Sequence, residues 1–464
     1  VIETRVDRLD PELKEILKAA SVEGEAFTAE IVAEVRNLDA RRVVGALSGD
    51  LARRHHLVEA GGVRQVGDRR VSRYRFSHGL FQRYLYETLD PAERVYLHEA
   101  IGNALEALYR GRTEEIAVRL ARHFEEAGSL DKAVRYRQQA GDAAARVYAA
   151  PEAVAQYSRA VQLARQVDTS GDELTVLYSR LGGASELNSE YGRALSTYEE
   201  MERLARQRDD RPMELASLVP RVAIHAEPTA VHDPEEARAI GARALSMARE
   251  LDDRRGEAEV LWGLSLANFF ANRTAEAVDC GERSLALVRE LGRREQTART
   301  LTDLGGLIYL YSGRVPQAIE ALQEAGDLWD ELGDRSMLAG SLAGLSIAYM
   351  YAGEYDRVIA LSERALRISR SIKNLWEQSR SQLAVAEVRR QRGEYDRAID
   401  AAEESIRLGE SGAFISSQTH TRARLALVYA DLGALSWAYE LIRAALRVAE
   451  GHKYTVDLPF IWGI

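Results

Sequence analysis

The sequence predicts a mainly α-helical protein in which a small module of helices and a β-hairpin precedes a right-handed helical solenoid. Three observations support this fold class. The 464 residues are 46% hydrophobic and include only nine prolines, so the chain can bury a large core or several linked ones. A helical pattern repeats with a period near 40 residues along most of the chain. The first 112 residues lack that period and contain strand-like segments.

The repeat is clearest where GEYDRVIALSERAL, beginning at Gly353, is followed by GEYDRAIDAAEESI, beginning at Gly393. A small residue after each turn recurs every 40 to 43 positions, at Ala153, Ala194, Ala237, Ala277, Ala318, Val358, Ala398 and Ala438. A second one follows seven positions later, at Ala160, Ala244, Ser284, Ala325, Ala365, Ser405 and Ala445, with Met201 as the exception. The expected turn residues are Gly313, Gly353, Gly393 and Gly433, with Asn272 in one repeat. This pattern predicts two closely packed helices per repeat.

The stretch from His225 to Pro234 is the weakest part of the pattern. Pro228 and Pro234 each remove a backbone N–H and restrict φ, so we expect them to stop or displace a helix there. A local kink or loop is predicted.

The first 112 residues predict three helices and a hairpin. Asp10 and Pro11 begin the first helix, and the other two are expected at 28–35 and 39 to about 53. Strands are expected at 56–60 and 71–76, joined by a turn at Gly61-Gly62. Asp90, with Glu93 as a capping-box acid, begins the next helix. We therefore predict a winged-helix domain with connecting helices at 1–112, a solenoid of about nine repeats at 113–450 and a C-terminal tail at 451–464.

Composition excludes several classes of function. The net charge is −10 and arginines alternate with acids, which opposes binding to nucleic acid. Arg41, Arg42, Arg53 and Arg54 fall on the third predicted helix, but Asp39, Asp50 and Glu59 counter a DNA-binding face. Cys280 is the single cysteine and no long apolar run occurs, so we expect a cytoplasmic protein without membrane contact. No HExxH or CxxC spacing is present, and we expect neither a metal site nor catalysis in this chain.

The repeat resembles the tetratricopeptide repeat. The matching residues are Leu345, Ser346, Tyr349, Gly353, Val358 and Ala365 in one unit and Leu181, Gly182, Ala194 and Tyr198 in another. A shorter-spaced unit runs through Leu120, Ala121, Phe124, Gly128, Ala133 and Ala140. The usual repeat has about 34 residues, and the longer form here is similar to the repeats of MalT-like regulators and kinesin light chains. The resemblance implies a superhelix with a binding groove.

The stretch RYRFSHGLFQRYLYETLDPAERVYLHEAI, which contains Phe76-Ser77-His78, resembles the winged-helix segment of STAND proteins, the signal-transduction ATPases that include MalT-like regulators. The resemblance implies a nucleotide-binding domain before the winged helix, with ADP or ATP and Mg²⁺ as its ligands. It also implies that His78 reaches the β-phosphate of ADP; the alternative is a histidine that only caps its helix.

A phosphate-binding loop of the P-loop type needs a lysine after a glycine, and no lysine of this sequence follows one. The five lysines are Lys14, Lys18, Lys132, Lys373 and Lys453. We therefore expect no cofactor in this chain, an ATPase domain on the N-terminal side of Val1, and a longer parent protein with a separate effector domain.

A stripe of aromatic and apolar residues is expected on the groove face of neighbouring first helices. Its members are Trp262, Leu266, Phe269, Phe270, Leu310, Tyr311, Met350 and Tyr351, and the groove then becomes polar at Glu387 and Arg390. Exposed residues of this kind predict a ligand or partner. The alternative is that they pack as core, or against Phe460, Ile461 and Trp462 of the tail.

The function predicted from these features is the sensor and regulatory part of a STAND ATPase. A protein or small-molecule inducer binds the repeat groove, and the protein's own nucleotide-binding domain responds, with oligomerisation on activation implied by the resemblance. The alternatives are a tetratricopeptide-repeat scaffold or adaptor and the sensor of a transcription regulator. The sequence leaves the inducer and the effector output open.

Overall fold

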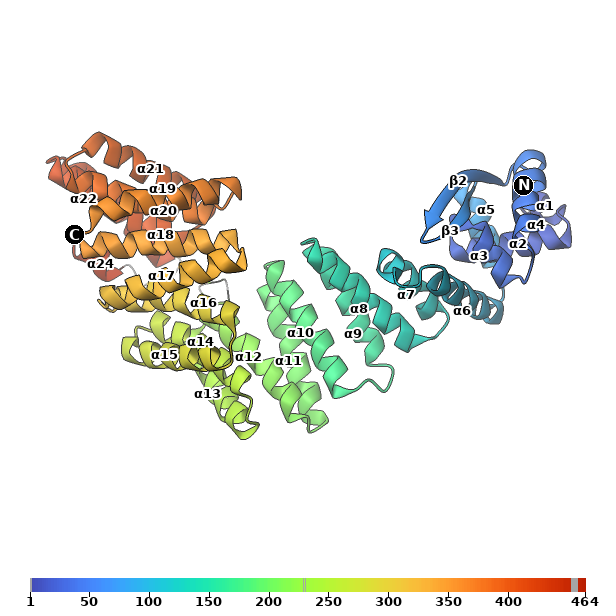
Figure 1. The fold of residues 1–464 in the computed structure, drawn as a ribbon, viewed down its shortest axis with the longest axis horizontal. Coiled ribbons are helices and arrows are strands. Elements are labelled where there is room, and N and C mark those ends of the chain that lie inside the picture. Colours follow the sequence, from blue (N-terminus) through green and yellow to red (C-terminus); the bar gives the residue numbers. More distant parts are fainter. Residues whose placement is uncertain (1, 228, 230, 452–457) are drawn as a thin grey trace. The chain divides into compact units, whose positions relative to one another are not determined.

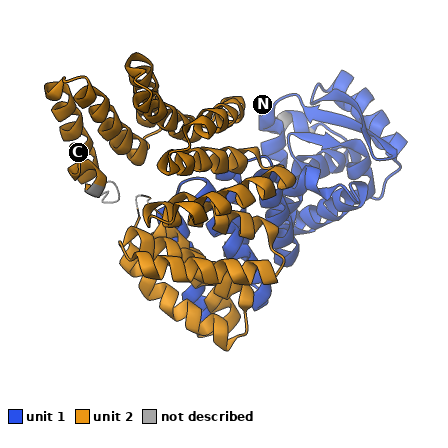
Figure 2. Ribbon diagram, turned by 60° about the vertical axis from the view of Figure 1, so that its left-hand side comes forward, with its two compact units in different colours: residues 1–205 blue, residues 206–464 orange. Residues whose placement is uncertain are grey.

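The computed structural model describes residues 2–227, 229, 231–451 and 458–464, and helices make up most of them (Figure 1). The chain forms two compact units, Val1–Ala205 and Arg206–Ile464 (Figure 2). The predicted boundary between residues 112 and 113 falls inside the first unit. The mainly helical repeat fold expected from the sequence is confirmed.

The first unit begins with the helices that the sequence predicts. They are α2 (Pro11–Glu23), α3 (Ala29–Val35) and a third helix that is made of α4 (Ala40–Ala46) and the π-helical segment η1 (Leu47–Arg54). A short helix that was not predicted, α1 (Ile2–Asp7), precedes them. Pro11 occupies the first turn of α2, where its missing N–H costs nothing. Asp39 caps α4, because its carboxylate accepts a hydrogen bond from the Arg42 N–H at 3.1 Å.

A three-stranded antiparallel sheet lies among these helices in the order β1-β3-β2. The strands are β1 (Ala26–Thr28), β2 (Val58–Val66) and β3 (Arg69–Phe76). The predicted hairpin is present, but its predicted turn at Gly61-Gly62 was wrong. These glycines form a bulge inside β2, where Gly62 has φ +87° and a Cβ on Gly61 would lie 3.3 Å from the Arg73 carbonyl oxygen. The strands connect through Gly67 and Asp68 instead.

Two helices follow the sheet: α5 (Gly79–Glu87) and α6 (Pro91–Leu108). Asp90 caps α6 as predicted, with its Oδ1 accepting from the Glu93 N–H at 2.9 Å. The expected capping-box role of the Glu93 side chain was wrong. Its carboxylate faces Lys18 and Arg36, each at 3.7 Å, because the cations of two neighbouring helices attract it more than the backbone N–H of the cap does.

The remaining elements of the first unit stack in sequence. They are η2 (Thr113–Ile116), α7 (Ala117–Glu126), α8 (Leu130–Arg146), α9 (Ala150–Ala164), α10 (Gly171–Leu187) and α11 (Tyr191–Gln207). One cluster of buried side chains extends from Val6 to Leu163 and includes Phe27, Phe76 and Phe124. The sheet module and the first stacked helices therefore share one core. Ala133 lies in α8 and Ala153 lies in α9, and α8 packs against both α7 and α9. Helix α8 is therefore the second helix of one predicted repeat and the first helix of the next.

A buried pair of histidines lies within this core. The Nδ1 atoms of His98 and His123 lie 3.0 Å apart and form a hydrogen bond, and Tyr86 Oη lies 3.1 Å from His98 Nε2. Burial and the charges of Arg122 and Arg94 lower the pKa of His98 to about 4. Burial, with the charges of Arg122 and Arg119 and the neighbouring His98, lowers the pKa of His123 well below its usual value. Both rings are therefore neutral in the folded protein.

We expect acid to destabilise the first unit through these histidines. Because unfolded histidines have a pKa of about 6.5, stability that is present above about pH 6.5 is lost as the pH falls toward the folded value of about 4. From about pH 7.5 to about pH 5, His98 alone should cost roughly 2 kcal/mol. Hydrogen exchange of peptides from α6 and α7, corrected for the intrinsic exchange rate, measures the loss. The same pH slope in a His98→Asn variant would contradict this assignment.

The second unit consists of stacked helices. They are α12 (Arg211–Ala226), α13 (Pro234–Glu250), α14 (Arg254–Phe270), α15 (Thr274–Glu290), α16 (Arg294–Asp303), the π-helical segment η3 (Leu304–Tyr309), α17 (Val315–Leu332), α18 (Arg335–Ala352), α19 (Tyr355–Ser371), α20 (Leu375–Gln391), α21 (Tyr395–Ser411), α22 (Ile415–Asp431), α23 (Leu435–Gly451) and α24 (Leu458–Trp462). The predicted break is present, because α12 ends at Ala226 and Pro234 begins α13. Pro228 and residues 452–457 of the predicted tail lie outside the described residues.

The turn and contact positions of the repeats match the prediction. The turn residues have positive φ at Asn272, Gly313, Gly353, Gly393 and Gly433. The recurring small residues pack between helices, and Ala277, Ala318, Val358 and Ala398 are completely buried. A larger side chain at these positions would separate the helices. Each repeat therefore stacks a first helix, a turn and a second helix against the next repeat.

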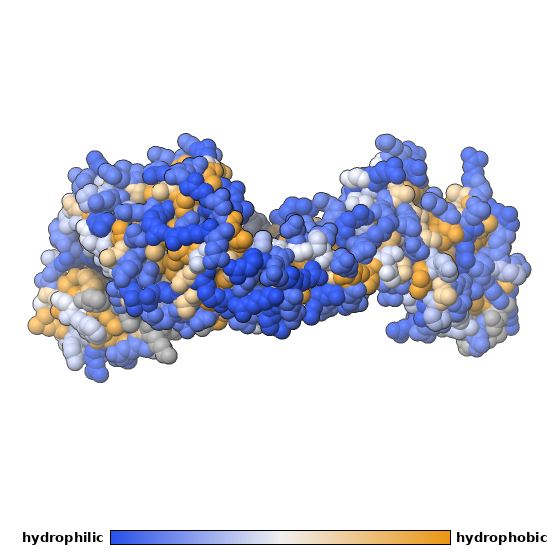
Figure 3. All heavy atoms as spheres, turned by 90° about the horizontal axis from the view of Figure 1, so that it is seen from below, coloured by the Kyte–Doolittle hydropathy of each residue, from blue (hydrophilic) through white to orange (hydrophobic). Residues whose placement is uncertain are grey.

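Hydrophilic residues cover most of the face shown in Figure 3. Among the described residues, no helix combines the length and the apolar content needed to cross a bilayer.

Candidate binding hollow

A hollow of about 390 Å³ lies in the second unit and is lined mainly by the first helices of successive repeats. We call it the first-helix hollow. Its lining comes from α16 with η3, from α18, from α20 and from α22, and Leu322 of α17 adds one side chain. First helices of neighbouring repeats pack against each other, so this lining is one continuous surface.

One wall of the hollow is apolar and aromatic. Leu307, Leu310 and Ile347 lie beside Tyr311 and Tyr351, whose residues are 44% and 45% exposed. The wall begins where α16 changes into the π-helical η3, which re-aims the side chains that follow. The glycines of this segment permit close packing, because a Cβ on Gly305 would lie 2.7 Å from Leu322 Cγ.

Asp303 adds a carboxylate to the lining of the hollow, directly before the π-helical turn. Its Oδ2 accepts a hydrogen bond from Trp262 Nε1 at 2.8 Å, and Arg299 lies over the Trp262 ring at 5.8 Å. Burial, together with the negative charge of Glu227, raises the pKa of Asp303 to about 6, against the opposing effects of the indole N–H and Arg299. The negative charge of ionised Asp303 is therefore only partly balanced by its neighbours.

A second carboxylate, Glu377, lines the hollow next to Arg380. Glu377 is 6% exposed and lies 3.3 Å from the Arg380 guanidinium. Burial raises its pKa although Arg380 opposes this. Gly340 of α18 makes room for the carboxylate, since a Cβ there would lie 3.0 Å from Glu377 Oε1.

The C-terminal helix α24 covers one end of the hollow. Phe460 stacks on His420, which lines the hollow, with ring centroids 4.7 Å apart. Arg424 lies 4.8 Å from the Phe460 ring, and its Nη2 donates to Tyr351 Oη at 3.1 Å. Ile461 is 1% exposed and packs with Ala423 and Ala445, whereas Trp462 is exposed.

The structure separates the residues of the predicted stripe. Leu310, Tyr311 and Tyr351 line the hollow together. Leu266, Phe269 and Met350 do not line it and are buried, with exposures of 4%, 8% and 5%, and Leu310 is itself only 8% exposed. Phe270 is partly buried and packs edge-on against Phe269 and His232, and Trp262 holds Asp303. The stripe is thus part hollow and part core.

Glu387 and Arg390, predicted as the polar end of the groove, instead form an internal ion cluster. Arg390 Nη2 donates to Glu387 Oε1 at 2.8 Å, and its Nη1 donates to Asp431 at 2.6 Å. Arg424 lies 3.2 Å from the same glutamate. Burial opposes ionisation of Glu387, but Arg390, Arg424 and Gln391 lower its pKa to about 2. These groups satisfy one another and do not line the hollow.

Sequence reasoning missed Asp303, Glu377, Arg380 and His420. A usable signal existed for Asp303. With the repeats aligned, its position corresponds to Trp262, Ala343, Leu383 and Ala423, so one aspartate interrupts an apolar or small series. A charged residue in such a series is expensive to bury without a partner or ligand.

His78 lies at the N-terminus of α5 in the first unit. It is exposed, and its Nδ1 accepts a hydrogen bond from the Leu80 N–H at 3.2 Å. The helix-capping interpretation of this residue therefore has a direct geometric basis.

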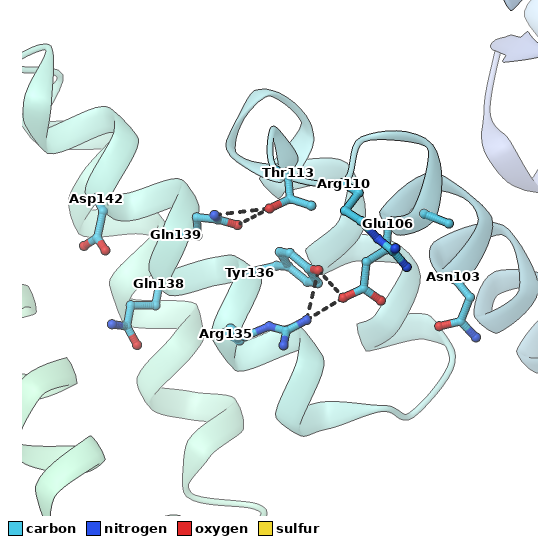
Figure 4. Close-up of a pocket in the computed structure, with 11 residues that line it drawn as sticks. Asn103, Glu106, Arg110, Thr113, Arg135, Tyr136, Gln138, Gln139 and Asp142 are labelled. Atoms are coloured by element: carbon cyan, nitrogen blue, oxygen red, sulfur yellow. Dashed lines mark hydrogen bonds and ion pairs between the residues drawn. The ribbon is translucent and has the colours of Figure 1, made fainter. Parts of the chain in front are cut away.

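A second hollow, of about 690 Å³, lies in the first unit between α6 and α8 (Figure 4). Its lining is polar, and its groups pair with each other. Tyr136 Oη donates to Glu106, Arg135 binds the same carboxylate, and Gln139 bonds to Thr113. Burial and the bond to Glu106 raise the pKa of Tyr136 to about 12. We interpret this hollow as a polar joint between two helices.

Within the described part of the chain, no group of three or more His, Cys, Asp or Glu side chains has an arrangement that would hold a metal ion.

Comparisons with known proteins agree with this architecture. A sequence model of the tetratricopeptide repeat matches residues 229–290. No curated protein matches the sequence. Among solved structures, the chain is similar to a STAND protein with a tetratricopeptide repeat sensor from Pyrococcus horikoshii, with 16% identity and a TM-score of 0.59. The match covers 99% of this chain and 65% of that protein, so the chain spans less than two thirds of its length.

Two further solved structures resemble the repeats. The apo form of RapI shares 15% identity and a TM-score of 0.50, with 69% of this chain and 98% of RapI covered. The apo form of the quorum sensor NprR from B. thuringiensis shares 13% identity and a TM-score of 0.50, with 75% and 96% covered. At these identities the likeness concerns the fold. The comparisons and the stacked helix pairs together identify the repeat region as a helical solenoid of the tetratricopeptide type.

Proposed function

We propose that this chain is the sensor and regulatory portion of a STAND ATPase. The observation that carries the proposal is the first-helix hollow, in which Tyr311 and Tyr351 remain exposed on a continuous surface built by successive repeats. Exposed aromatic residues in a recess favour a ligand that covers them. The similarity to a STAND protein over 99% of this chain supports the choice of parent protein.

The N-terminal module then acts as a winged helix next to a nucleotide-binding domain. The order is α2, β1, α3, α4 with η1, β2 and β3, which is three helices and a hairpin with one short strand after the first helix. His78 is exposed at a helix N-terminus, where a neighbouring domain that holds ADP, or ATP with Mg²⁺, has access to it. A Walker-type loop encoded upstream of Val1 is expected; a gene without one would contradict the ATPase part of the proposal.

A sensor needs a mechanical link between the winged helix and the repeats. In the first unit, Arg119 and Arg122 of α7 bind the C-terminus of α2, at Glu23 Oε1 and at the Glu23 carbonyl oxygen, each at 2.8 Å. These bonds, together with the shared core, connect the module directly to the first repeat. Ligand binding activates only if it favours the active arrangement over the inactive one.

The expected occupant of the hollow is a peptide or a segment of a partner protein. The similarity to a protein described as a quorum sensor supports a sensing role for such repeats. The chain itself performs no chemistry in this proposal, and its output depends on domains of the parent protein.

Binding to an array of acetylated and amidated peptides of about eight residues tests the site. The double variant Tyr311→Ala/Tyr351→Ala should bind the best peptides at least about tenfold more weakly, because each lost ring removes roughly 1.5 kcal/mol or more of apolar contact. The matched control is Tyr148→Ala/Tyr439→Ala, which removes exposed tyrosines outside the hollow. Equal losses in both variants, or no binding to any peptide, would refute the hollow as the sensing site.

A further inference from the structure

The charges that line the first-helix hollow do not balance. Its lining includes two acidic side chains, Asp303 and Glu377. Among the described lining residues, Arg380 is the one arginine, and no lysine is present. Arg380 lies 3.3 Å from Glu377 and forms an ion pair with it. The other carboxylate, Asp303, has no cationic partner in the lining.

The Asp303 carboxylate is held in place by one hydrogen bond and has no ion-pair partner among the described residues. Its Oδ2 accepts from Trp262 Nε1, and among the described residues neither a hydrogen bond to its Oδ1 nor an ion pair with an arginine or lysine is present. The indole bond fixes the orientation of the carboxylate. Burial and the charge of Glu227 raise the pKa of Asp303 although Arg299 opposes this, which agrees with a carboxylate whose negative charge is only partly balanced.

The rest of the lining suits the aliphatic part of a long cation. Leu307, Leu310 and Ile347 provide aliphatic surface, and the exposed rings of Tyr311 and Tyr351 provide aromatic faces. Lysine and arginine side chains combine an apolar stem with a charged end, and both ends find complementary surface here. Arg380 and Glu377 neutralise each other, so a ligand anion has no comparable anchor.

Resting on the proposed function, we infer that the first-helix hollow recognises an extended peptide with a lysine or arginine side chain. The cationic end of that side chain pairs with Asp303, and an apolar neighbour in the peptide packs against Tyr311 and Tyr351.

The dimensions favour a peptide over a small free cation. Four first helices contribute to the lining, from α16 to α22. Neighbouring helix axes lie about 8–10 Å apart, so three intervals span roughly 25–30 Å. An extended chain covers about 3.3 Å per residue, which corresponds to about eight residues. The hollow itself, of about 390 Å³, holds the anchoring side chain and its apolar neighbour, and the rest of such a chain lies along the adjoining first helices.

The test uses acetylated and amidated peptide pools of about eight residues, in which one position is fixed as Arg, Lys, Gln or Glu. The wild-type chain should bind the Arg or Lys pools at least about tenfold more tightly than the Gln pools, because a charge-assisted bond replaces a neutral one. Asp303→Asn should abolish this preference but bind the Gln pools like the wild type. Its amide oxygen still accepts from Trp262, so the variant should keep its fold. Asp330→Asn, which changes an exposed aspartate paired with Arg364, serves as the control and should keep the preference.

The outcomes separate this inference from the proposed function. A lack of preference for Arg or Lys, a preference that survives in Asp303→Asn, or a preference for Glu would overturn the inference while peptide sensing by the hollow stands. No binding by any pool, or binding that Tyr311→Ala/Tyr351→Ala leaves unchanged, would instead overturn the proposed function. Binding of N-acetylarginine amide tests whether a small free cation is sufficient as the ligand. If it binds as tightly as the best pool, the ligand is a small cation and the peptide assignment is wrong.

Discussion

Replacing Glu23 with alanine is expected to lower the free energy of unfolding of the first unit by about 3–5 kcal/mol. The Glu23 side chain is completely buried and lies 2.8 Å from Arg119 and 3.5 Å from Arg73. Its carboxylate also accepts from the N–H and the hydroxyl of Thr28, both at 2.9 Å. Burial raises the pKa of Glu23, against the opposing effect of Arg119. Removing the carboxylate leaves Arg119 and the buried Thr28 N–H without this acceptor, and Arg73 without its counter-charge.

The measurement must report on the first unit alone. All five tryptophans, Trp262, Trp329, Trp376, Trp437 and Trp462, belong to the second unit, so fluorescence does not follow it. Hydrogen exchange of peptides from α2 and α7, measured over a urea series, follows the unfolding of the first unit. Glu59→Ala is the control, because Glu59 pairs with Arg75 at 2.6 Å in an exposed position and should change stability by less than about 1 kcal/mol. A similar effect of both variants would show that the Glu23 cluster does not hold the unit together.

The second large effect is expected at Gly182 of α10. A Cβ at this position would overlap the Tyr198 ring and lie 2.5 Å from its Oη. Tyr198 is 3% exposed and donates to Glu186 at 2.8 Å, so it has no free direction in which to move. Gly182→Ala should therefore destabilise this pair of helices by about 2–3 kcal/mol, although alanine is the better helix former.

The adjacent glycine provides a matched control. A Cβ on Gly183 would meet no atom within 4 Å, so Gly183→Ala should stabilise α10 by up to about 1 kcal/mol. Hydrogen exchange of α10 and α11 distinguishes the two signs. Tyr198→Leu should reduce the cost of Gly182→Ala, since the smaller side chain vacates the space. Additive effects in the double variant, or the same sign for both glycines, would contradict the packing explanation.

Much of the solenoid follows from local rules that are visible in the sequence. The turn glycines predict positive φ, because other residues adopt it at a cost, and Gly313, Gly353, Gly393 and Gly433 all have it. The alanines and serines at fixed spacing predict close helix contacts, because their size limits the distance between helix axes. Both signals depend on a few neighbouring residues and recur in each repeat.

The hairpin shows where local rules are insufficient. Gly61-Gly62 and Gly67-Asp68 are both acceptable turn sequences. The choice between them depends on how β2 pairs with β3, and the bulge at Gly62 lets the strand continue past the first pair. Strand pairing is a long-range property, so the sequence pattern placed the turn too early.

The lining of the first-helix hollow was predicted in part. Repeat alignment placed Leu310, Tyr311 and Tyr351 on one surface, and all three line the hollow. The same alignment gave no means to separate them from Phe269 and Met350, which are buried and do not line it. A rotation of a small fraction of a helical turn decides which side is exposed, and the π-helical η3 changes that rotation between neighbouring repeats.

The sequence by itself determined the helical repeat, the turn positions within it and the order of three N-terminal helices and a hairpin, although not α1 or β1, because each depends on backbone preferences and side-chain size over a few residues. Only the tertiary structure decided which stripe residues are exposed, that Trp262 orients Asp303 from the preceding repeat, and that Glu387 and Arg390 form an ion cluster with Arg424 and Asp431 of the next repeat. These features depend on distances between residues about 40 positions apart, and such distances are fixed only when the repeats stack against each other.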